Sequence, residues 1–231
     1  MKKKIGVLEG DYIGPEITGE ALKALDAIGE KFNHTFERVK LYASGEAYDK
    51  FGEILPKETL EKGAECDALL KGPFGGPPEE INHPKWSQVE KEAILPLRKH
   101  YNLYANLRET KVYESLLDIS PLKPERIKGT NILIVRELIS GIYFGEKKSG
   151  TIDGERFASD TEKYTESEIR RIAIKAFELA MTRRRKLTLV AKSNILFSSQ
   201  LWREVVAEVQ PNYPDVDFDY MHVDNASMQL I

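Results

Sequence analysis

Short apolar runs alternate with amphipathic stretches along this chain, and this alternation constrains the fold more than any other feature. The runs of strand length are residues 5–8, 131–135, 187–190 and 216–223. Residues 15–28 and 169–180 instead repeat apolar side chains at helical spacing. Strands that alternate with helices predict an α/β fold with a largely parallel sheet. Such folds bind ligands beyond the carboxyl ends of their strands, so residues that follow strands are the first site candidates.

Composition excludes several classes of protein. The 231 residues are 41% hydrophobic and 31% charged with a net charge of -3. The chain as a whole is therefore not basic, and we expect no nucleic-acid partner. The basic run 183–186 follows a predicted helix end, where cations complement the helix dipole. Cys66 is the only cysteine, which predicts no disulfide framework and a cytoplasmic location. No apolar run approaches the roughly 20 residues that span a membrane, so we expect no membrane partner.

Local signals define individual elements. The capping box from Thr165 to Glu168 predicts a helix start, and Ser198 or Ser199 is expected to cap the next helix. The polar segment 145–164 contains Asp153-Gly154, which is typical of a hairpin turn, so this segment is expected to project as a hairpin.

The glycine- and proline-rich stretch at 71–92 separates two α/β segments. We therefore expect two domains, with residues 1–98 forming the N-terminal part of the first and residues 99–231 forming the second.

Arg98, Arg108 and Arg136 each end an apolar stretch. A guanidinium cannot lose its charge, so drawing all three toward a core is unfavourable unless an anion receives them. The alternative is local ion pairing of Arg136 with Glu137 and of Arg108 with Glu109. Neighbouring residues on a strand point to opposite faces, which disfavours both pairs. The arginines therefore predict a shared site for a small polycarboxylate.

Tyr143, Lys192 and Asp224 lie just past apolar runs, where an α/β fold places its ligand. Each also has an ordinary structural interpretation: Tyr143 could only pack its ring, Lys192 could be a solvated lysine, and Asp224 could cap a helix. A single carboxylate does not make a metal site. Gly10-Asp-Tyr-Ile-Gly14 does not match G-x-G-x-x-G, so an ordinary Rossmann cofactor site is not predicted.

Several longer motifs occur in order along the whole chain. They are Gly10-Asp-Tyr-Ile-Gly-Pro-Glu16, Leu97-Arg-Lys99, Leu103-Tyr-Ala-Asn-Leu-Arg108, Val135-Arg-Glu-Leu138, Gly141-Ile-Tyr-Phe-Gly-Glu146, Lys192-Ser-Asn194 and Tyr220-Met-His-Val-Asp-Asn-Ala226. With these motifs the chain resembles the β-decarboxylating dehydrogenases, and within that family the branch that acts on 3-isopropylmalate.

The resemblance implies an isocitrate/isopropylmalate dehydrogenase-like fold and an NAD-dependent oxidative decarboxylation. The reaction would convert (2R,3S)-3-isopropylmalate to 4-methyl-2-oxopentanoate and CO₂, a step of leucine biosynthesis. The residue roles that it implies are substrate carboxylate binding for Arg98, Arg108 and Arg136, removal of the hydroxyl proton for Lys192, protonation of the enolate for Tyr143, ligation of Mg²⁺ or Mn²⁺ for Asp224, and NAD contacts for Ile13, Lys71, Gly72 and Pro73. Lys192 and Asp224 would come from the partner subunit of a homodimer joined by the 145–164 arm.

Substrate choice within the family depends on Ile94 and Leu95, which precede Arg98 where isocitrate members carry polar contacts. An apolar pair suits an isopropyl group. Three positions depart from the family pattern, Tyr12, Lys91 and Ala191, and Lys71-Gly-Pro resembles the isocitrate branch. Isocitrate, homoisocitrate and tartrate dehydrogenases therefore stay as alternatives.

Family members continue past Ile231, so we expect a chain whose first domain is incomplete. A non-catalytic fragment of the enzyme is the competing interpretation.

Overall fold

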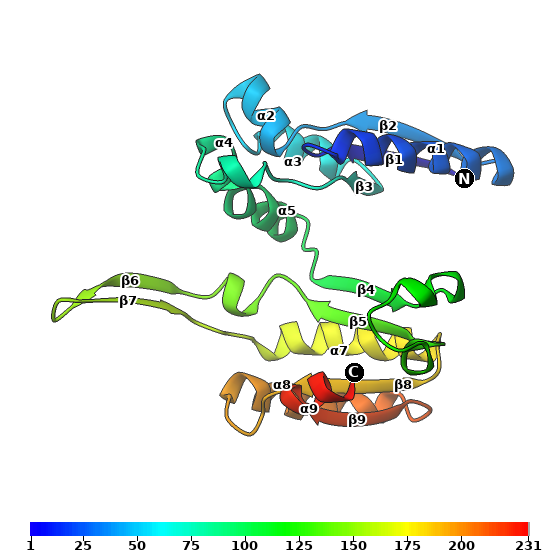
Figure 1. The fold of residues 1–231 in the computed structure, drawn as a ribbon, viewed down its shortest axis with the longest axis vertical. Helices are drawn as coiled ribbons and strands as arrows, with labels where there is room; N and C mark the ends of the chain where they lie inside the picture. Colours follow the sequence, from blue (N-terminus) through cyan, green and yellow to red (C-terminus); the bar gives the residue numbers. More distant parts are fainter. Residues whose placement is uncertain (231) are drawn as a thin grey trace. The chain divides into compact units, whose positions relative to one another are not determined.

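The strands of the protein form four separate sheets, seen in a computed structural model that describes residues 1–230 (Figure 1). The chain divides into two compact units, Met1–Asn102 and the part from Leu103 onward, which we call the N-terminal and C-terminal units. Within the described residues, no helix has the length and apolarity needed to cross a membrane.

The N-terminal unit contains a three-stranded parallel sheet of order β2-β1-β3. In chain order its elements are β1 (Lys2–Leu8), α1 (Gly14–Phe32), β2 (Thr35–Lys40), α2 (Ser44–Phe51), α3 (Lys57–Ala64), β3 (Ala68–Lys71), the 3₁₀ turn η1 (Pro78–Glu80), α4 (Pro84–Ser87), the π-helical turn η2 (Glu90–Ile94) and α5 (Leu95–His100). Pro15 lies in the first turn of α1, where its missing N–H costs nothing. The predicted strand, turn and helix at the N-terminus are confirmed.

The core of this unit consists of two clusters of buried side chains. Leu8, Leu41 and Leu97 lie in the first, and Ile54 and Val89 lie in the second. Leu97 therefore fixes α5 against the sheet, and with it the helical turn that carries Arg98.

The C-terminal unit contains three two-stranded sheets. In chain order its elements are β4 (Ala105–Lys111), the 3₁₀ helix η3 (Glu114–Ile119), α6 (Pro124–Ile127), β5 (Asn131–Glu137), the 3₁₀ turn η4 (Gly141–Tyr143), β6 (Lys147–Ile152), β7 (Glu155–Asp160), α7 (Glu166–Met181), β8 (Lys186–Ala191), α8 (Phe197–Val209), the 3₁₀ turn η5 (Gln210–Asn212), β9 (Asp217–His222) and α9 (Val223–Gln229).

The prediction of a largely parallel sheet is wrong for this unit, because only β8 and β9 pair in parallel. They are connected through α8, which supplies the crossover that parallel strands need. Between β4 and β5 the chain forms only the short helices η3 and α6, so β5 returns antiparallel to β4.

The predicted capping box is confirmed at the start of α7. The Thr165 side chain accepts a hydrogen bond from the Glu168 N–H, and Glu168 accepts one from the Thr165 N–H. Ile169, Ala173 and Phe177 then enter the core between α7, α8 and the β8–β9 sheet. The predicted serine cap of α8 is wrong, because its N-cap is Leu196 and no side chain caps it.

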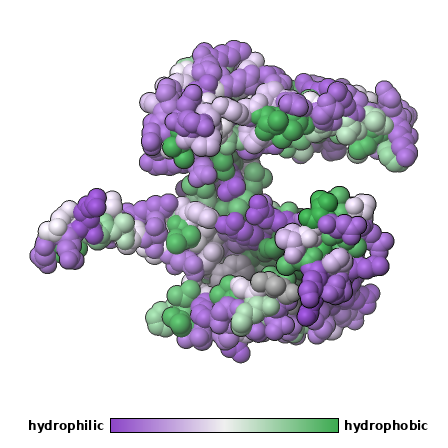
Figure 2. All heavy atoms as spheres, in the orientation of Figure 1, coloured by the Kyte–Doolittle hydropathy of each residue, from purple (hydrophilic) through white to green (hydrophobic). Residues whose placement is uncertain are grey.

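The predicted hairpin is confirmed as β6 and β7, with its turn at Asp153 and Gly154. Both turn residues have positive φ, 53° and 84°, as the two central residues of a type I′ turn require. Every residue of the two strands is exposed, and Figure 1 shows the hairpin extending away from the rest of its unit. Its surface is mainly hydrophilic (Figure 2). Contacts within the chain do not bury either face of this hairpin.

Candidate active-site residues

Arg108 and Arg136 lie on the same face of the β4–β5 sheet. Arg108 is paired with Ile134 and Arg136 with Asn106, so the two arginines are diagonal neighbours across the strands. Such neighbours have Cα atoms roughly 7–8 Å apart, close enough for long side chains to reach one ligand. Both arginines are exposed, so the prediction that they are drawn toward a core is wrong for these two.

The two acidic neighbours face the opposite side of this sheet, as the alternation of strand side chains predicts. Glu137 pairs with Arg171 at 2.7 Å, and Glu109 lies 3.8 Å from Arg183. The interpretation that Arg108 and Arg136 are neutralised by their neighbours is therefore wrong. Within residues 1–230, neither arginine forms an ion pair, and the sheet presents two uncompensated guanidinium groups on one face.

Tyr143 lies beside this pair. The Arg136 guanidinium lies 5.5 Å from the centre of its ring, and the tyrosine is 50% exposed. Gly141 begins the turn that presents it, with φ of 72°. A Cβ at Gly141 would come within 2.3 Å of the Tyr164 hydroxyl, so this turn requires glycine.

Glu137 organises the approach to Tyr143 and was missed by sequence reasoning. Its side chain is 1% exposed, and one carboxylate oxygen accepts hydrogen bonds from the N–H groups of Ile139 and Ser140 at 3.0 and 2.9 Å. Its other oxygen accepts from Arg171. The available signal was a carboxylate on the inward face at the end of a strand, where only a paired charge is tolerated.

Lys192 and Asp224 meet beyond the carboxyl ends of β8 and β9. Ala191 is paired with His222, so the two strands end side by side, and Lys192 Nζ donates to Asp224 Oδ1 at 2.6 Å. This hydrogen bond lowers the pKa of the Asp224 carboxyl below its usual value. The helix-cap interpretation of Asp224 is wrong, because α9 begins at Val223 and its N-cap is His222.

Arg98, Ile94 and Leu95 lie together in the N-terminal unit. Ile94 and Leu95 are four and three residues before Arg98, so a helical turn places all three on one side. All three are half-buried, whereas Leu97 is in the core. The apolar pair therefore adjoins the guanidinium.

Lys71 ends β3 and remains partly exposed to solvent, while neighbouring protein atoms surround its ammonium. Burial, followed by repulsion from Arg98, lowers the pKa of its ammonium. Lys71 Nζ donates to the Gly72 carbonyl at 2.8 Å and lies 3.9 Å from the centre of the Phe74 ring. Lys71 and Arg98 thus bring two positive charges near each other.

The four candidate cofactor residues, Ile13, Lys71, Gly72 and Pro73, come from two adjoining loops. The Asp11 N–H donates to the Pro73 carbonyl at 2.8 Å. Sequence reasoning missed the role of the buried Asp11 carboxylate, which accepts from the N–H groups of Gly45 and Gly75 at 3.0 and 2.9 Å. Asp11 therefore ties the loops at residues 10–14 and 72–75 to the start of α2.

Tyr12 lies in the first of these loops with φ of 57° and is 71% exposed. Only glycine adopts this left-handed conformation without steric cost. The departure at position 12 therefore places a strained aromatic side chain where the backbone favours glycine.

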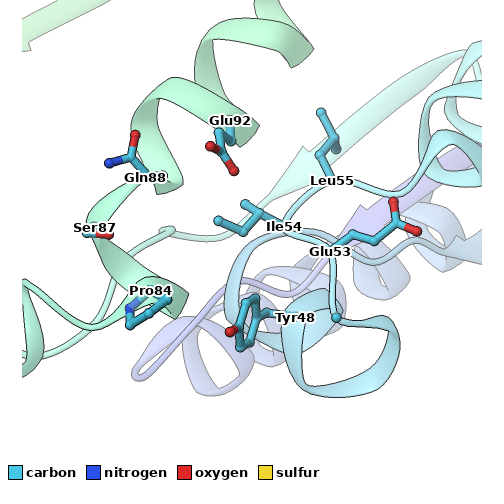
Figure 3. A pocket seen from close by; sticks show the side chains of 9 residues that line it. Tyr48, Glu53, Ile54, Leu55, Pro84, Ser87, Gln88 and Glu92 are labelled. Atoms are coloured by element: carbon cyan, nitrogen blue, oxygen red, sulfur yellow. The ribbon is translucent and has the colours of Figure 1, made fainter.

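A concavity of about 530 Å³ in the N-terminal unit does not coincide with the candidate residues. Figure 3 shows Tyr48, Ile54 and Glu92 among the side chains that line it. Glu53 and Glu92 both contribute carboxylates, which repel a dicarboxylate. The candidates for substrate carboxylate and side-chain binding lie on β4, β5, η2 and α5 instead.

A sequence model of isocitrate/isopropylmalate dehydrogenases matches residues 4–231. The chain belongs to the isocitrate/isopropylmalate dehydrogenase family. The resemblance of the sequence motifs to this family is thereby confirmed.

Curated members of the family are similar over the whole chain. The 3-isopropylmalate dehydrogenase of Aquifex aeolicus is 50% identical over 234 residues, which cover 100% of this chain and 64% of that protein. The 3-isopropylmalate dehydrogenase of Carboxydothermus hydrogenoformans is 50% identical over 229 residues, covering 99% of this chain and 61% of that protein. The chain thus spans less than two thirds of the length of these relatives.

Solved structures share the fold. Isocitrate dehydrogenase from Methylococcus capsulatus matches with a TM-score of 0.82 and 32% identity, over 99% of this chain and 62% of that one. A β-decarboxylating dehydrogenase from Thermococcus kodakarensis matches with a TM-score of 0.73 and 28% identity, over 99% of this chain and 60% of that one. The predicted isocitrate/isopropylmalate dehydrogenase-like fold is confirmed.

The residues of this chain fit the divalent metal of the family in part. Within residues 1–230, no group of three or more acidic, histidine or cysteine side chains could hold a metal ion. Asp224 offers one carboxylate, and Mg²⁺ is commonly bound by one or two carboxylates together with substrate oxygens and water. Asp224 therefore fits as one ligand of a site that the substrate helps to form.

Proposed function

We propose that the protein takes part in the NAD-dependent oxidative decarboxylation of 3-isopropylmalate to 4-methyl-2-oxopentanoate in leucine biosynthesis. The observation that carries this proposal is the pair of uncompensated arginines, Arg108 and Arg136, on one face with Tyr143 beside them. A guanidinium presents a planar donor fork that matches a carboxylate, so the pair suits a malate derivative. The 50% identity to curated 3-isopropylmalate dehydrogenases supports the same substrate.

Arg98, Arg108 and Arg136 would hold the two carboxylates of the substrate, and Ile94 and Leu95 would contact its isopropyl group. Each lost apolar contact should reduce discrimination by about 1–3 kcal/mol. The support for this assignment is the placement of Ile94 and Leu95 on the side of the helical turn that carries Arg98.

Two side chains of this chain would move protons. Lys192 would remove the proton of the substrate hydroxyl, directly or through water, and Asp224 would be one ligand of Mg²⁺ or Mn²⁺. Tyr143, whose ring lies 5.5 Å from the Arg136 guanidinium, would donate its phenolic proton to the carbon that loses CO₂. When bound, NAD would supply the hydride acceptor, and Mg²⁺ or Mn²⁺ would supply a Lewis acid for the carbonyl of the oxidised substrate.

We also propose a homodimer whose two subunits share the site. Two groups of candidate residues lie in the C-terminal unit, Arg108, Arg136 and Tyr143 in one and Lys192 and Asp224 in the other. Within the described part of the chain no hydrogen bond or ion pair joins the groups. The fully exposed β6–β7 hairpin supports a role as the arm that joins the subunits. A cytoplasmic location is proposed on the single cysteine.

For the domain organisation, we propose that residues 1–98 form the N-terminal part of a first domain and residues 99–231 a second. The compact units Met1–Asn102 and Leu103–Ile231 support this division. Ile13, Lys71, Gly72 and Pro73 would contact NAD from the first domain.

The experiment is an assay of NADH formation by the purified protein with 3-isopropylmalate, isocitrate, homoisocitrate and tartrate under Mn²⁺. We expect turnover of 3-isopropylmalate to exceed that of the other three. An Arg136→Gln variant should lose this activity, and Arg126→Gln, an exposed arginine of α6, should keep it. Preferred turnover of another substrate would refute the assignment of Ile94 and Leu95.

Isocitrate is the second candidate substrate, and Lys71 is the observation that favours it. Isocitrate carries one carboxylate more than 3-isopropylmalate carries, and Lys71, which is close enough to Arg98 for repulsion to lower the pKa of its ammonium, would receive it. A Lys71→Met variant separates the two assignments in the same assay. Loss of isocitrate turnover with retained 3-isopropylmalate turnover would assign Lys71 to the extra carboxylate.

A further inference from the structure

The peptide segment Lys192-Ser193 is held from both sides by side chains. The Lys192 N–H donates to Ser199 Oγ at 3.2 Å, and Gln200 Nε2 donates to the Ser193 carbonyl at 3.1 Å, both from α8. On the other side, the Ser193 N–H donates to the Tyr220 hydroxyl oxygen at 3.2 Å. Lys192 therefore projects from a backbone whose conformation α8 and β9 determine together.

The Tyr220 hydroxyl is the centre of this arrangement. Besides the Ser193 N–H, it lies 2.8 Å from Ser193 Oγ, 2.9 Å from His222 Nδ1 and 3.3 Å from the Ala191 carbonyl oxygen. A phenolic hydroxyl donates one hydrogen bond and accepts two, so these neighbours use its full capacity. One oxygen atom thus joins the end of β8 to the end of β9.

The ring of Tyr220 is held as firmly as its hydroxyl. It meets the His222 ring edge to face, with centroids 5.2 Å apart, and the Arg203 guanidinium lies 5.1 Å from its centre. Ser193 is 7% exposed, so its N–H has little access to water as a substitute partner. Loss of the hydroxyl would therefore free the Lys192-Ser193 segment rather than be repaired by solvent.

We propose that Tyr220 is a positioning residue for Lys192. Its hydroxyl fixes the backbone at Ser193 so that the lysine ammonium reaches the Asp224 carboxylate at 2.6 Å. Tyr220 itself touches no reacting atom. The catalytic consequence rests on the proposed function, in which Lys192 is the base, whereas the geometric consequence does not.

The test is site-resolved amine labelling of the whole chain with trinitrobenzenesulfonate, read by peptide mass spectrometry. In the wild type, the ion pair with Asp224 should slow labelling of Lys192 relative to Lys186, an exposed residue at the start of the same strand. Tyr220→Phe should raise the ratio of Lys192 to Lys186 labelling about fivefold, the effect of one hydrogen bond. General destabilisation would act equally in a control variant that loses a hydroxyl from the core.

Tyr213→Phe is the matched control, since it removes a hydroxyl from a tyrosine whose ring stacks on Phe177 in the core. Its labelling ratio should equal that of the wild type. An unchanged ratio in Tyr220→Phe, or an equal rise in both variants, would overturn the positioning role. In the turnover assay, Tyr220→Phe should lower kcat about fivefold with KM within about twofold, the pattern of an interaction needed only for the chemical step. If the labelling ratio rises while kcat stays at the wild-type value, Tyr220 positions the lysine and the role of Lys192 as base is refuted.

Discussion

The buried carboxylate of Glu137 provides the sharpest test of how the structure presents Tyr143. We consider Glu137→Gln, which preserves the size of the side chain and removes its charge. The amide has one oxygen, which can accept either from the N–H groups of Ile139 and Ser140 or from Arg171, but not from both sides. Its NH₂ group then faces donors, and a hydrogen bond to a charged group is lost.

The magnitude follows from the exposure of the two partners. The Glu137 side chain is 1% exposed and the Arg171 side chain is 27% exposed, so the lost partner is only partly replaced by water. Removing one partner of a buried ion pair costs about 3–5 kcal/mol, and partial solvation of the arginine lowers this to about 2–4 kcal/mol. For a unit of this size, the melting temperature should fall on the order of 10 °C.

The assay is urea unfolding followed by tryptophan fluorescence in a Trp86→Phe background, where Trp202 is the only tryptophan and reports on the C-terminal unit. Glu109→Gln is the matched control, because Glu109 is 54% exposed and lies 3.8 Å from Arg183. An exposed pair of this kind contributes about 0–1 kcal/mol. Equal effects of the two substitutions on the free energy of unfolding would refute the structural role of Glu137.

Three further predictions concern the loops and the candidate base. Tyr12→Gly should stabilise the N-terminal unit by about 0.5–1 kcal/mol, because φ of 57° strains a tyrosine. The gain should exceed that of Asn33→Gly, since asparagine tolerates φ of 53°. Equal urea midpoints of the two variants would contradict this prediction. The pKa of Lys71 is lowered in the folded protein, so between this pKa and the ordinary lysine value of 10.5 the unfolded chain binds more protons than the folded protein does. The stability of the wild type relative to Lys71→Met should therefore rise with pH across that window. A stability difference between these two proteins that does not change with pH in urea titrations would show that Lys71 is solvated. Lys192→Met should abolish turnover while the affinity for 3-isopropylmalate stays within roughly tenfold of the wild-type value. The control Lys186→Met should change neither turnover nor affinity. An unchanged kcat in Lys192→Met would show that the lysine takes no part in the chemistry.

The sequence predicted those parts of the fold that depend on local signals. Thr165 and Glu168 set the start of α7, and Asp153-Gly154 set the hairpin turn, because the side chains and backbone that decide these features lie within four residues of each other. The apolar runs before Lys192 and Asp224 predicted two strand ends, and parallel pairing of β8 with β9 brought these residues together.

Long-range pairing was beyond the sequence. A period of two assigns Arg136 and Glu137 to opposite faces but does not say that β4 is the antiparallel partner of β5, which is what puts Arg108 and Arg136 on one face. The same limit explains Ser199, which was expected to cap α8 and instead accepts the Lys192 N–H. A serine near a helix start satisfies whichever donor the tertiary structure brings to it.

The central claim is that Arg108 and Arg136 hold the carboxylates of a substituted malate. The most direct test is calorimetric titration of 3-isopropylmalate, in the presence of Mn²⁺, into three proteins. These are the wild type, Arg136→Gln and the control Arg126→Gln. We predict saturable binding by the wild type and an unchanged affinity for Arg126→Gln. The Kd of Arg136→Gln should be about 10- to 100-fold higher, which corresponds to the free energy of a hydrogen bond to a charged group. Equal affinity of the wild type and Arg136→Gln, or no saturable binding by the wild type, would contradict the claim.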